Sequence, residues 1–359
     1  MVKNNIDLAG KTVLVTGAAG FIGSNLCKIL LNTVANIKVV GLDNMNDYYD
    51  VRIKEERLNE LETYSNFTFV KGNLADKPLI DSLFEEHKPY VVVNLAAQAG
   101  VRYSITNPRA YIESNLIGFY NILEACRHSY EGGNEGVAHL VYASSSSVYG
   151  SNKKVPYSTE DKVDNPVSLY AATKKSNELM AHSYSKLYNI PSTGLRFFTV
   201  YGPAGRPDMA YFGFTDKLRA GKTIQIFNYG HCKRDFTYVD DIVEGVVRVM
   251  MHAPEKQTGD DGLPLPPYKV YNIGNNSPEN LLDFVTILQE ELIRAEVLPS
   301  DYDFESHKEL VPMQPGDVPV TFADTTPLEE DFGFKPATPL RTGLRAFAEW
   351  YAKYYGKGK

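Results

Sequence analysis

A glycine-rich turn near the N-terminus constrains the fold of this 359-residue chain more than any other feature. The segment TVLVTGAAGFIG (12–23) places Gly17, Gly20 and Gly23 between a β-branched strand pattern and a helical pattern. There the first glycine makes a tight turn, the second lets backbone approach a pyrophosphate, and the third lets helix and strand pack closely. The free N–H groups of the helix start, around Phe21 and Ile22, then face the anion. The turn therefore predicts a dinucleotide site.

Short apolar strand patterns alternate with amphipathic helical patterns through the first half of the chain. We expect strands at Thr12–Thr16, Lys38–Leu42, Thr68–Lys71, Val91–Leu95 and His139–Ala143. Helices are expected at 20–33, 78–87, 108–128 and 168–188. Near-continuous apolar strands joined by helices indicate a parallel sheet covered on both faces. The fold class predicted is α/β, a Rossmann doubly wound parallel sheet with a smaller α/β substrate-binding C-terminal domain.

Chain length and a change of pattern after Pro191 indicate two domains. At about 150 residues per domain the chain is long enough for roughly two. We expect residues 1–195 to form the dinucleotide-binding domain, with segments near 235–275 returning to it. Residues 196–234 and 276–359 are expected to form the smaller domain.

Composition excludes several classes of function. The net charge of −7 argues against binding of nucleic acid, which needs a basic face. No apolar run is long enough for a membrane helix, and the N-terminus lacks a signal-peptide core. Cys27, Cys126 and Cys232 form no CxxC pair, and the histidines form no HxxxH pair, so no metal site is expected. A reducing cytoplasm is the predicted location.

An acidic residue ends the second predicted strand. Asp43 follows Gly23 by 20 residues, at the end of KVVGLD. A carboxylate there accepts hydrogen bonds from an adenosine ribose diol and repels a 2′-phosphate. The sequence therefore predicts NAD rather than NADP as the cofactor.

A tyrosine and a lysine four residues apart form the candidate catalytic pair. Tyr170 and Lys174 fall on one face of a predicted helix, where an ammonium group favours the phenolate. The YxxxK pattern alone is weak, because it also occurs at Tyr149, Tyr229 and Tyr355. Upstream, the hydroxyl run Ser144–Ser147 ends the fifth strand, at the sheet edge where doubly wound folds bind ligands.

Together these motifs resemble the extended short-chain dehydrogenase/reductase family of nucleotide-sugar epimerases and dehydratases. The glycine turn, NLAA (94–97), Asn115, SSSSVYG and YAATK carry the likeness in the first half. LRFFTVYGPAGRPDMA (195–210), KRDFTYVDDIVEGV (233–246) and QPGDVPVTFAD (314–324) carry it in the second. Within the family, LDNMNDYYDVRIKEERL (42–58) and AAQAGVRYS (96–104) are most similar to the UDP-glucuronate 4-epimerases.

The resemblance implies roles for individual residues. Tyr170 matches the catalytic acid/base, Lys174 the residue that binds the nicotinamide ribose and lowers the Tyr170 pKa, and Ser145 the catalytic hydroxyl. Asn73 stands where the family usually has Asp, so its contact with adenine departs from the pattern. The remaining cofactor contacts implied are Asn44, Leu74, Leu95, Ala96, Ala97 and Asn115.

The resemblance also implies a UDP-sugar site. Arg206 and Thr199 match residues that hold the sugar carboxylate, and Arg234 matches the residue that clamps the pyrophosphate. Gln98, Arg102, Ser146 and Ser147 are expected to line the sugar pocket. Asp317 is expected either to contact the uridine ribose or to cap a turn.

The serine loop indicates which reaction follows. Dehydratases of the family carry an acid in the loop before VYG, and the related decarboxylases have Glu directly before it. Here Ser147 occupies that place. The resemblance thus implies C4 epimerisation of UDP-glucuronate to UDP-galacturonate through a transient 4-keto sugar.

Two other functions stay open. One is a 4-epimerase or dehydratase acting on another nucleotide sugar, such as UDP-glucose or UDP-N-acetylglucosamine. The other is a redox-sensing module that holds NAD without chemistry, against which the intact Ser145, Tyr170 and Lys174 set argues. The resemblance further implies a homodimer packed through the helices at 108–128 and 168–188.

Overall fold

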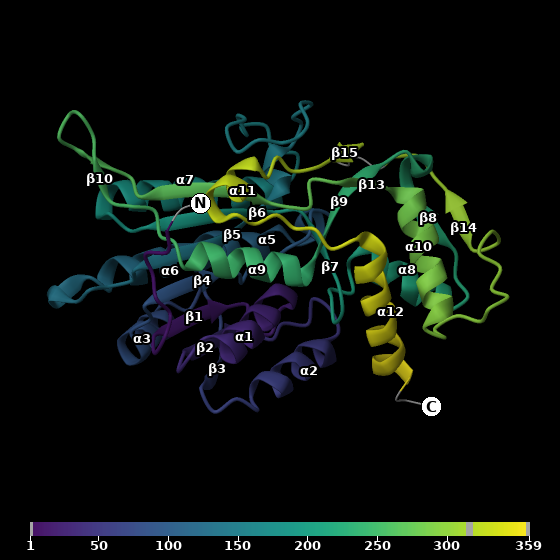
Figure 1. The fold of residues 1–359 in the computed structure, drawn as a ribbon, viewed down its shortest axis with the longest axis horizontal. Coiled ribbons are helices and arrows are strands. Elements are labelled where there is room, and N and C mark those ends of the chain that lie inside the picture. Colours follow the sequence, from purple (N-terminus) through teal and green to yellow (C-terminus); the bar gives the residue numbers. More distant parts are fainter. Residues whose placement is uncertain (1–2, 314–318, 357–359) are drawn as a thin grey trace.

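A seven-stranded parallel sheet forms the centre of the computed structural model, which describes residues 3–313 and 319–356 (Figure 1). The strand order is β12-β6-β5-β4-β1-β2-β3, and every neighbouring pair is parallel. The chain starts at the centre and reverses direction between β1 and β4, so a ligand crevice is expected there. The strands are β1 Thr12–Thr16, β2 Lys38–Asp43, β3 Phe67–Lys71, β4 Val91–Asn94, β5 His139–Ser145, β6 Ser192–Phe197 and β12 Tyr268–Ile273.

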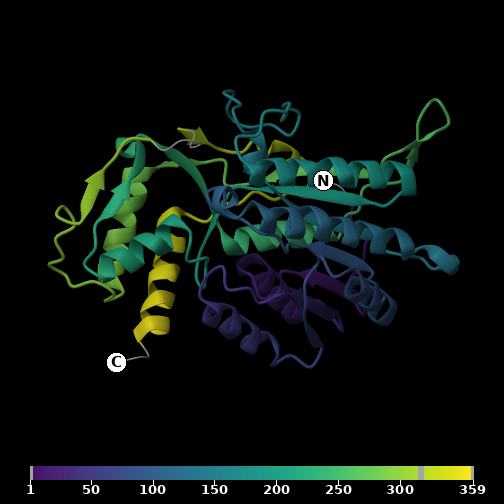
Figure 2. The same cartoon turned by 180° about the vertical axis from the view of Figure 1, so that it is seen from behind.

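Helices cover both faces of this sheet (Figures 1 and 2). On one face α1 (Phe21–Thr33) and α9 (Val239–Met250) bury residues such as Leu26 and Val243 in a shared core. On the other, α3 (Lys77–His87), α6 (Gly118–His128) and α7 (Leu169–Tyr188) bury residues such as Phe119. This architecture confirms the predicted doubly wound α/β fold.

Two segments differ from the predicted secondary structure. The expected helix at 108–128 comprises α5 (Pro108–Tyr111), a π-helical stretch η1 (Ile112–Ile117) and α6. A further helix, α2 (Val51–Leu61), was not expected; the side chain of Asp50 caps it by accepting the Arg52 N–H. Three further short helical segments lie in other parts of the connections between strands, namely α4 (Tyr103–Thr106), η2 (Glu131–Gly133) and η3 (Ser146–Tyr149).

A smaller part of the molecule lies beside the carboxyl ends of the central strands, on the right in Figure 1. Its core joins helices α8, α10 and α12 through aromatic residues such as Phe212, Phe284 and Phe347. Its elements are β7 Thr199–Tyr201, α8 Ala210–Arg219, β8 Ile224–Ile226, η4 Phe227–Gly230, β9 Lys233–Tyr238, β13 Pro278–Asn280, α10 Leu281–Arg294, β14 Lys308–Leu310, β15 Val320–Thr321 and α12 Leu340–Gly356.

The chain returns from this part to the central sheet, where α9 packs on α1 and β12 pairs with β6. The helix α11 (Thr326–Phe332) packs near β12, and β10 (Gln257–Thr258) and β11 (Pro264–Leu265) form a protruding hairpin (Figure 1). The exact limits of the two domains stay a prediction. Within residues 3–313 and 319–356, no helix has the length and apolar character needed to cross a membrane.

Candidate active site

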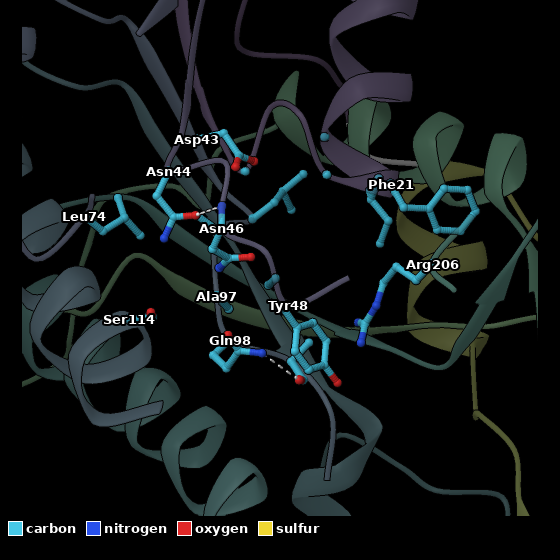
Figure 3. A pocket seen from close by; sticks show the side chains of 18 of the residues that line it. Phe21, Asp43, Asn44, Asn46, Tyr48, Leu74, Ala97, Gln98, Ser114 and Arg206 are labelled. Atoms are coloured by element: carbon cyan, nitrogen blue, oxygen red, sulfur yellow. Dashed lines mark hydrogen bonds between the residues drawn. The ribbon is translucent and has the colours of Figure 1, made fainter. Parts of the chain in front are cut away.

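One pocket opens at the carboxyl ends of β1, β2, β4 and β5 (Figure 3). At one end lie Asp43 and Leu74, and at the other lie Tyr48, Gln98 and Arg206. The predicted cofactor residues that line it are Gly17, Gly20, Phe21, Ile22, Gly23, Asp43, Asn44, Asn73, Leu74, Leu95, Ala96, Ala97, Tyr170 and Lys174. The pocket therefore brings the glycine turn and the candidate catalytic pair into one space.

The glycine turn has no room for side chains. Gly17 has a φ of +72°, and an added Cβ would lie 2.9 Å from the Ala96 nitrogen. At Gly23 the added Cβ would lie 2.1 Å from the Gly17 carbonyl oxygen. No side chain caps α1, and its first turn holds no acidic residue. The N–H groups there are thus available to an anionic ligand, as a pyrophosphate site requires.

A buried ion pair lies at the end of the pocket that Asp43 and Leu74 line. Asp43 accepts a hydrogen bond from the Met45 N–H at 2.8 Å, and its carboxylate lies 3.7 Å from Lys54 Nζ. Lys54, 5% exposed, also donates to Asn46 Oδ1 at 3.0 Å. Sequence analysis missed Lys54 because it missed α2. The available signal was the Asp50 cap followed by apolar residues at helical spacing.

The candidate catalytic residues converge from two elements. Tyr170 and Lys174 lie on successive turns of α7, and Ser145 ends β5. Lys174 Nζ donates to the Ala143 carbonyl at 2.9 Å. Ser145 Oγ accepts hydrogen bonds from the Ser147 hydroxyl at 2.9 Å and the Ser147 N–H at 3.2 Å. Ser147 thus fixes the serine that the pocket exposes beside Tyr170.

Burial has the largest effect on the pKa values of Tyr170 and Lys174. Burial lowers the pKa of Lys174 to about 8. Burial raises the pKa of Tyr170, and Ser145 and Arg206 lower it part of the way back. In this structure the lowering contributions thus come from Ser145 and Arg206, so the role of Lys174 in lowering the Tyr170 pKa stays a prediction.

A buried ion pair fixes α7 against the sheet below the site. Glu178, one turn beyond Lys174, accepts from Arg196 Nε at 2.8 Å and Nη2 at 2.9 Å. It also accepts from the hydroxyl of Ser144 at 2.7 Å. Both ends of the pair are 3% exposed. Because Ser144 precedes Ser145, this network ties the helix of Tyr170 to the serine loop.

Asn115 braces the pocket wall and does not line the pocket. Its amide accepts from the Gln98 N–H at 2.8 Å and donates to the Gln98 carbonyl at 3.0 Å. It also donates to Thr173 Oγ1 at 3.0 Å, on α7. The wide π-helical turn places Asn115 there, and such turns are frequent at functional sites. Its expected contact with the cofactor stays a prediction.

The structure places some of the predicted substrate residues in the pocket lining and others outside it. Gln98, Ser145, Tyr170 and Arg206 line the pocket. Ser146, Ser147 and Thr199 lie next to it in sequence, but are not among its lining residues within the part of the chain described. Arg102 lies over the Phe227 ring at 5.2 Å, and Arg234 donates to the Lys233 and Pro319 carbonyls. Asp317 lies outside the described residues.

Pocket residues that sequence analysis missed come from loops, helices and strands. Besides Lys54 and Asn46, they include Tyr48 on the β2–α2 connection and Met209 after Arg206. The Tyr48 hydroxyl donates to Asp208 Oδ2 at 3.1 Å, and burial together with Asp208 raises the pKa of Tyr48 to about 12. A residue that only meets the pocket through such tertiary contacts leaves no local signal in the sequence.

Known proteins resemble the chain over nearly all of its length. It is 51% identical to Protein CapI of Staphylococcus aureus, over 96% of this chain and 99% of that protein. It is 47% identical to UDP-glucuronate 4-epimerase 4 of Arabidopsis thaliana, over 98% of this chain and 77% of that protein. A crystal structure of the UDP-glucuronic acid 4-epimerase from Bacillus cereus, in complex with UDP-glucuronic acid and NAD, is also similar. It shares 31% identity and a TM-score of 0.80, covering 96% of this chain and all of that one.

A sequence model described as the NAD dependent epimerase/dehydratase family matches residues 13–274. The matched span contains the glycine turn, Asp43, the serine loop and the Tyr170–Lys174 pair. Fold, pocket and comparisons agree, and the chain belongs to the NAD dependent epimerase/dehydratase family.

Proposed function

We propose that this protein is an isomerase that inverts C4 of UDP-glucuronate to give UDP-galacturonate, with NAD as its bound cofactor. The observation that carries the proposal is the single pocket that joins the glycine turn and Asp43 to Ser145, Tyr170 and Arg206. Similarity to UDP-glucuronate 4-epimerases supports the choice of substrate.

The residues at one end of the pocket fit a dinucleotide. The α1 N-terminus and the close glycine turn suit a pyrophosphate, and Asp43 suits the adenosine ribose diol. Asn44, Asn73 and Leu74 would surround the adenine, and Lys174 would hold the nicotinamide ribose. When bound there, the nicotinamide ring supplies a reversible acceptor for a hydride.

The chemistry assigned to the chain is proton transfer at the C4 oxygen. Tyr170 would accept the hydroxyl proton as C4 is oxidised and return it as C4 is reduced. Ser145, held by Ser147, would donate a hydrogen bond to the same oxygen. Epimerisation then requires the 4-keto sugar to present its opposite face before C4 is reduced.

The serine loop supports epimerisation over elimination. Removal of water from the sugar needs an additional acid or base beside Tyr170, and residues 144–147 are all serine. Without that group, the simplest outcome is reduction at C4 of the same sugar.

The remaining sugar and nucleotide contacts are proposed by family resemblance. Arg206 and Thr199 would hold the C6 carboxylate, with Gln98, Arg102, Ser146 and Ser147 around the sugar. Arg234 would clamp the pyrophosphate, and Asp317 would contact the uridine ribose. An arginine suits the carboxylate because it can bind both oxygens at once.

We also propose a homodimer, assembled through η1, α6 and α7. Apolar side chains on these neighbouring elements are exposed, with Leu179 60%, Leu187 70% and Tyr120 43% accessible. Leu179 and Leu187 lie two helical turns apart, on one face of α7. Location in a reducing cytoplasm stays a prediction, in keeping with three free buried cysteines.

Turnover without added cofactor tests the function. The purified protein is incubated with UDP-glucuronate, and the sugar nucleotides are separated by chromatography. We expect UDP-galacturonate from the wild type and a loss of about 10²–10⁴-fold in rate in Tyr170→Phe. No conversion of the acid, together with turnover of UDP-glucose or UDP-N-acetylglucosamine, would favour a neutral substrate instead. Unchanged turnover in Tyr170→Phe would contradict the role of Tyr170.

A further inference from the structure

A cluster of polar side chains closes the sugar end of the pocket, where three loops meet. Tyr48 comes from the β2–α2 connection, Gly100 from the β4–α4 connection, and Arg206 and Asp208 from the β7–α8 connection. A Cβ built on Gly100 would lie 2.9 Å from the Tyr48 hydroxyl and 3.9 Å from Asp208 Oδ2. Figure 3 shows Tyr48 and Arg206 side by side at this end. The cluster thus links the sheet domain to the smaller part of the molecule.

Asp208 takes one edge of the Arg206 guanidinium. Arg206 Nε donates to Asp208 Oδ1 at 3.0 Å, and Nη2 donates to Oδ2 at 2.5 Å. An arginine offers two edges for bidentate binding, Nε with Nη2 and Nη1 with Nη2. Occupation of the first edge by Asp208 directs the second edge toward any other carboxylate. Asp208 itself is not among the pocket-lining residues, whereas Arg206 is.

The backbone before Arg206 is fixed independently. Arg57 on α2 is 5% exposed and donates to the Ala204 carbonyl at 3.1 Å through Nε. Its guanidinium also donates to the Gly205 carbonyl at 3.1 Å and to the Ala19 carbonyl at 3.0 Å. Arg57 thus joins the glycine turn to the residue before Arg206. Loss of the Asp208 carboxylate would therefore free the Arg206 side chain while its backbone stays in place.

We propose that Asp208, held by Tyr48, is a positioning residue that aims the Arg206 guanidinium at the C6 carboxylate and thereby keeps the 4-keto uronate from losing CO2. This inference rests on the function proposed above. It assigns a role to a carboxylate that does not itself face the pocket. The Tyr48 hydroxyl stays protonated at neutral pH and so can donate to Asp208 throughout.

The reactivity of the 4-keto uronate explains why the orientation of the Arg206 guanidinium matters. In the 4-keto uronate the carboxylate is β to the ketone, which arises from two-electron oxidation at C4 with a nicotinamide dinucleotide as oxidant. Loss of CO2 breaks the C5–C6 bond and leaves its electron pair on C5, as the enolate of the C4 ketone. C5 then takes a proton, giving a 4-keto pentose. The bond breaks readily only when it is aligned with the carbonyl π system, so an arginine that holds the carboxylate out of that alignment suppresses the loss.

The test measures how the intermediate partitions between two products. Wild type and Asp208→Asn are incubated with UDP-glucuronate and added NAD, and UDP-galacturonate, UDP-4-keto-pentose and CO2 are quantified. We expect the ratio of decarboxylated product to UDP-galacturonate to rise about tenfold in Asp208→Asn, since small misplacements of positioning groups have effects of that size or larger. Asp208→Glu keeps the carboxylate and is expected to restore most of the wild-type ratio.

A matched control removes a carboxylate whose arginine partner does not line the pocket. Asp50→Asn breaks the Asp50–Arg52 pair, in which the arginine side chain is 76% exposed, and asparagine still caps α2. In Asp50→Asn, the ratio of decarboxylated product to UDP-galacturonate is expected to equal that of the wild type. A ratio that stays at the wild-type value in Asp208→Asn, with or without a fall in total rate, would overturn the positioning role.

A second variant decides the matter if Asp208→Asn does not fold. Tyr48→Phe removes the hydrogen bond to Asp208 and leaves the Arg206–Asp208 pair, so a smaller rise in the ratio is expected. The wild-type ratio in Tyr48→Phe would then overturn the proposal. If the wild type itself makes no UDP-galacturonate, the proposed function fails, and this inference fails with it. That result is distinct from an unchanged ratio.

Discussion

Asp43 and Lys54 show how two side chains, one predictable and one not, define the same end of the pocket. The acid follows a strand at a spacing typical of dinucleotide sites, so sequence alone identified it. Lys54 lies 3.7 Å from it only because α2 folds back over the strand end. Such a contact depends on tertiary packing, and no local pattern encodes it.

This pair determines the expected preference between NAD and NADP. In Asp43→Ser the carboxylate that repels a 2′-phosphate is gone, and Lys54 loses its charged partner. We expect the ratio of NADP to NAD affinity to rise by about tenfold or more, the change that roughly 1.4 kcal/mol gives. Titration of both dinucleotides into protein freed of bound nucleotide measures it. Asp47→Ser, at an exposed position of the same loop, is the control, and an Asp43→Ser ratio equal to that of the control would contradict the assignment.

At the scale of elements, the parallel strands and their covering helices were largely predictable, because buried strands of this kind read as apolar runs. Strand β1 has the predicted bounds, and α7 begins one residue later than expected because Ser168 is its cap. The π-helical turn η1 was not predictable. It contains Asn115, whose hydrogen bonds to Gln98 and Thr173 join residues distant in sequence, and no local pattern marks such contacts.

The pair that joins α7 to β6 carries a prediction about stability. Glu178→Gln leaves Arg196 buried without a charged partner, which costs about 3–5 kcal/mol in the free energy of unfolding. The exposed pair between Glu244 and Arg248 on α9 provides a control, since Glu244→Gln is expected to cost at most about 1 kcal/mol. Urea unfolding of the two variants measures both values. Equal losses would mean that the buried pair contributes no more than a surface one.

Strand β5 begins with a histidine that makes stability depend on pH. His139 is fully buried, and its Nε2 forms a hydrogen bond of 2.8 Å with Thr193 Oγ1. Burial lowers the pKa of His139 from 6.5 to about 4. Because the unfolded chain binds the proton more tightly, this stability is present above pH 6.5 and is lost as the pH falls toward 4. We expect a loss of about 2 kcal/mol between pH 7 and pH 5 from this group.

Comparison of pH profiles isolates the histidine from other groups. The free energy of unfolding is measured at pH 7 and pH 5 for the wild type, His139→Gln and His231→Gln, the last at an exposed histidine. The loss on acidification should shrink in His139→Gln alone. The same loss in all three proteins would assign it elsewhere.

At the scale of the whole molecule, the division of labour between the two parts follows from chain topology. The central sheet supplies the cofactor end of the pocket, and the loop before α8 brings Arg206 from the smaller part. The net charge of −7 argues against binding of nucleic acid, yet the proposed substrate is a polyanion. We assign recognition of this polyanion to local groups, which are the α1 N-terminus and a few arginines. The net charge of the whole chain gives no information about such local groups.

The mass of the protein in solution tests the proposed homodimer. Leu179→Glu puts a charge into the exposed apolar face of α7, and burying it unpaired would disfavour association. Light scattering of the eluted protein should give twice the chain mass of 40.1 kDa for the wild type and the single mass for Leu179→Glu. Leu263→Glu, at an exposed residue of the β10–β11 hairpin, should stay dimeric. A monomeric wild type would overturn the proposal.

The proposed epimerisation requires oxidation and reduction at C4 of the sugar within one site. This requirement is checked with UDP-glucuronate that carries deuterium at C4, and NMR follows the label in the product. We expect UDP-galacturonate to form and to keep the deuterium at C4. Loss of the label to water, or its recovery only in unreacted substrate, would contradict hydride transfer at C4.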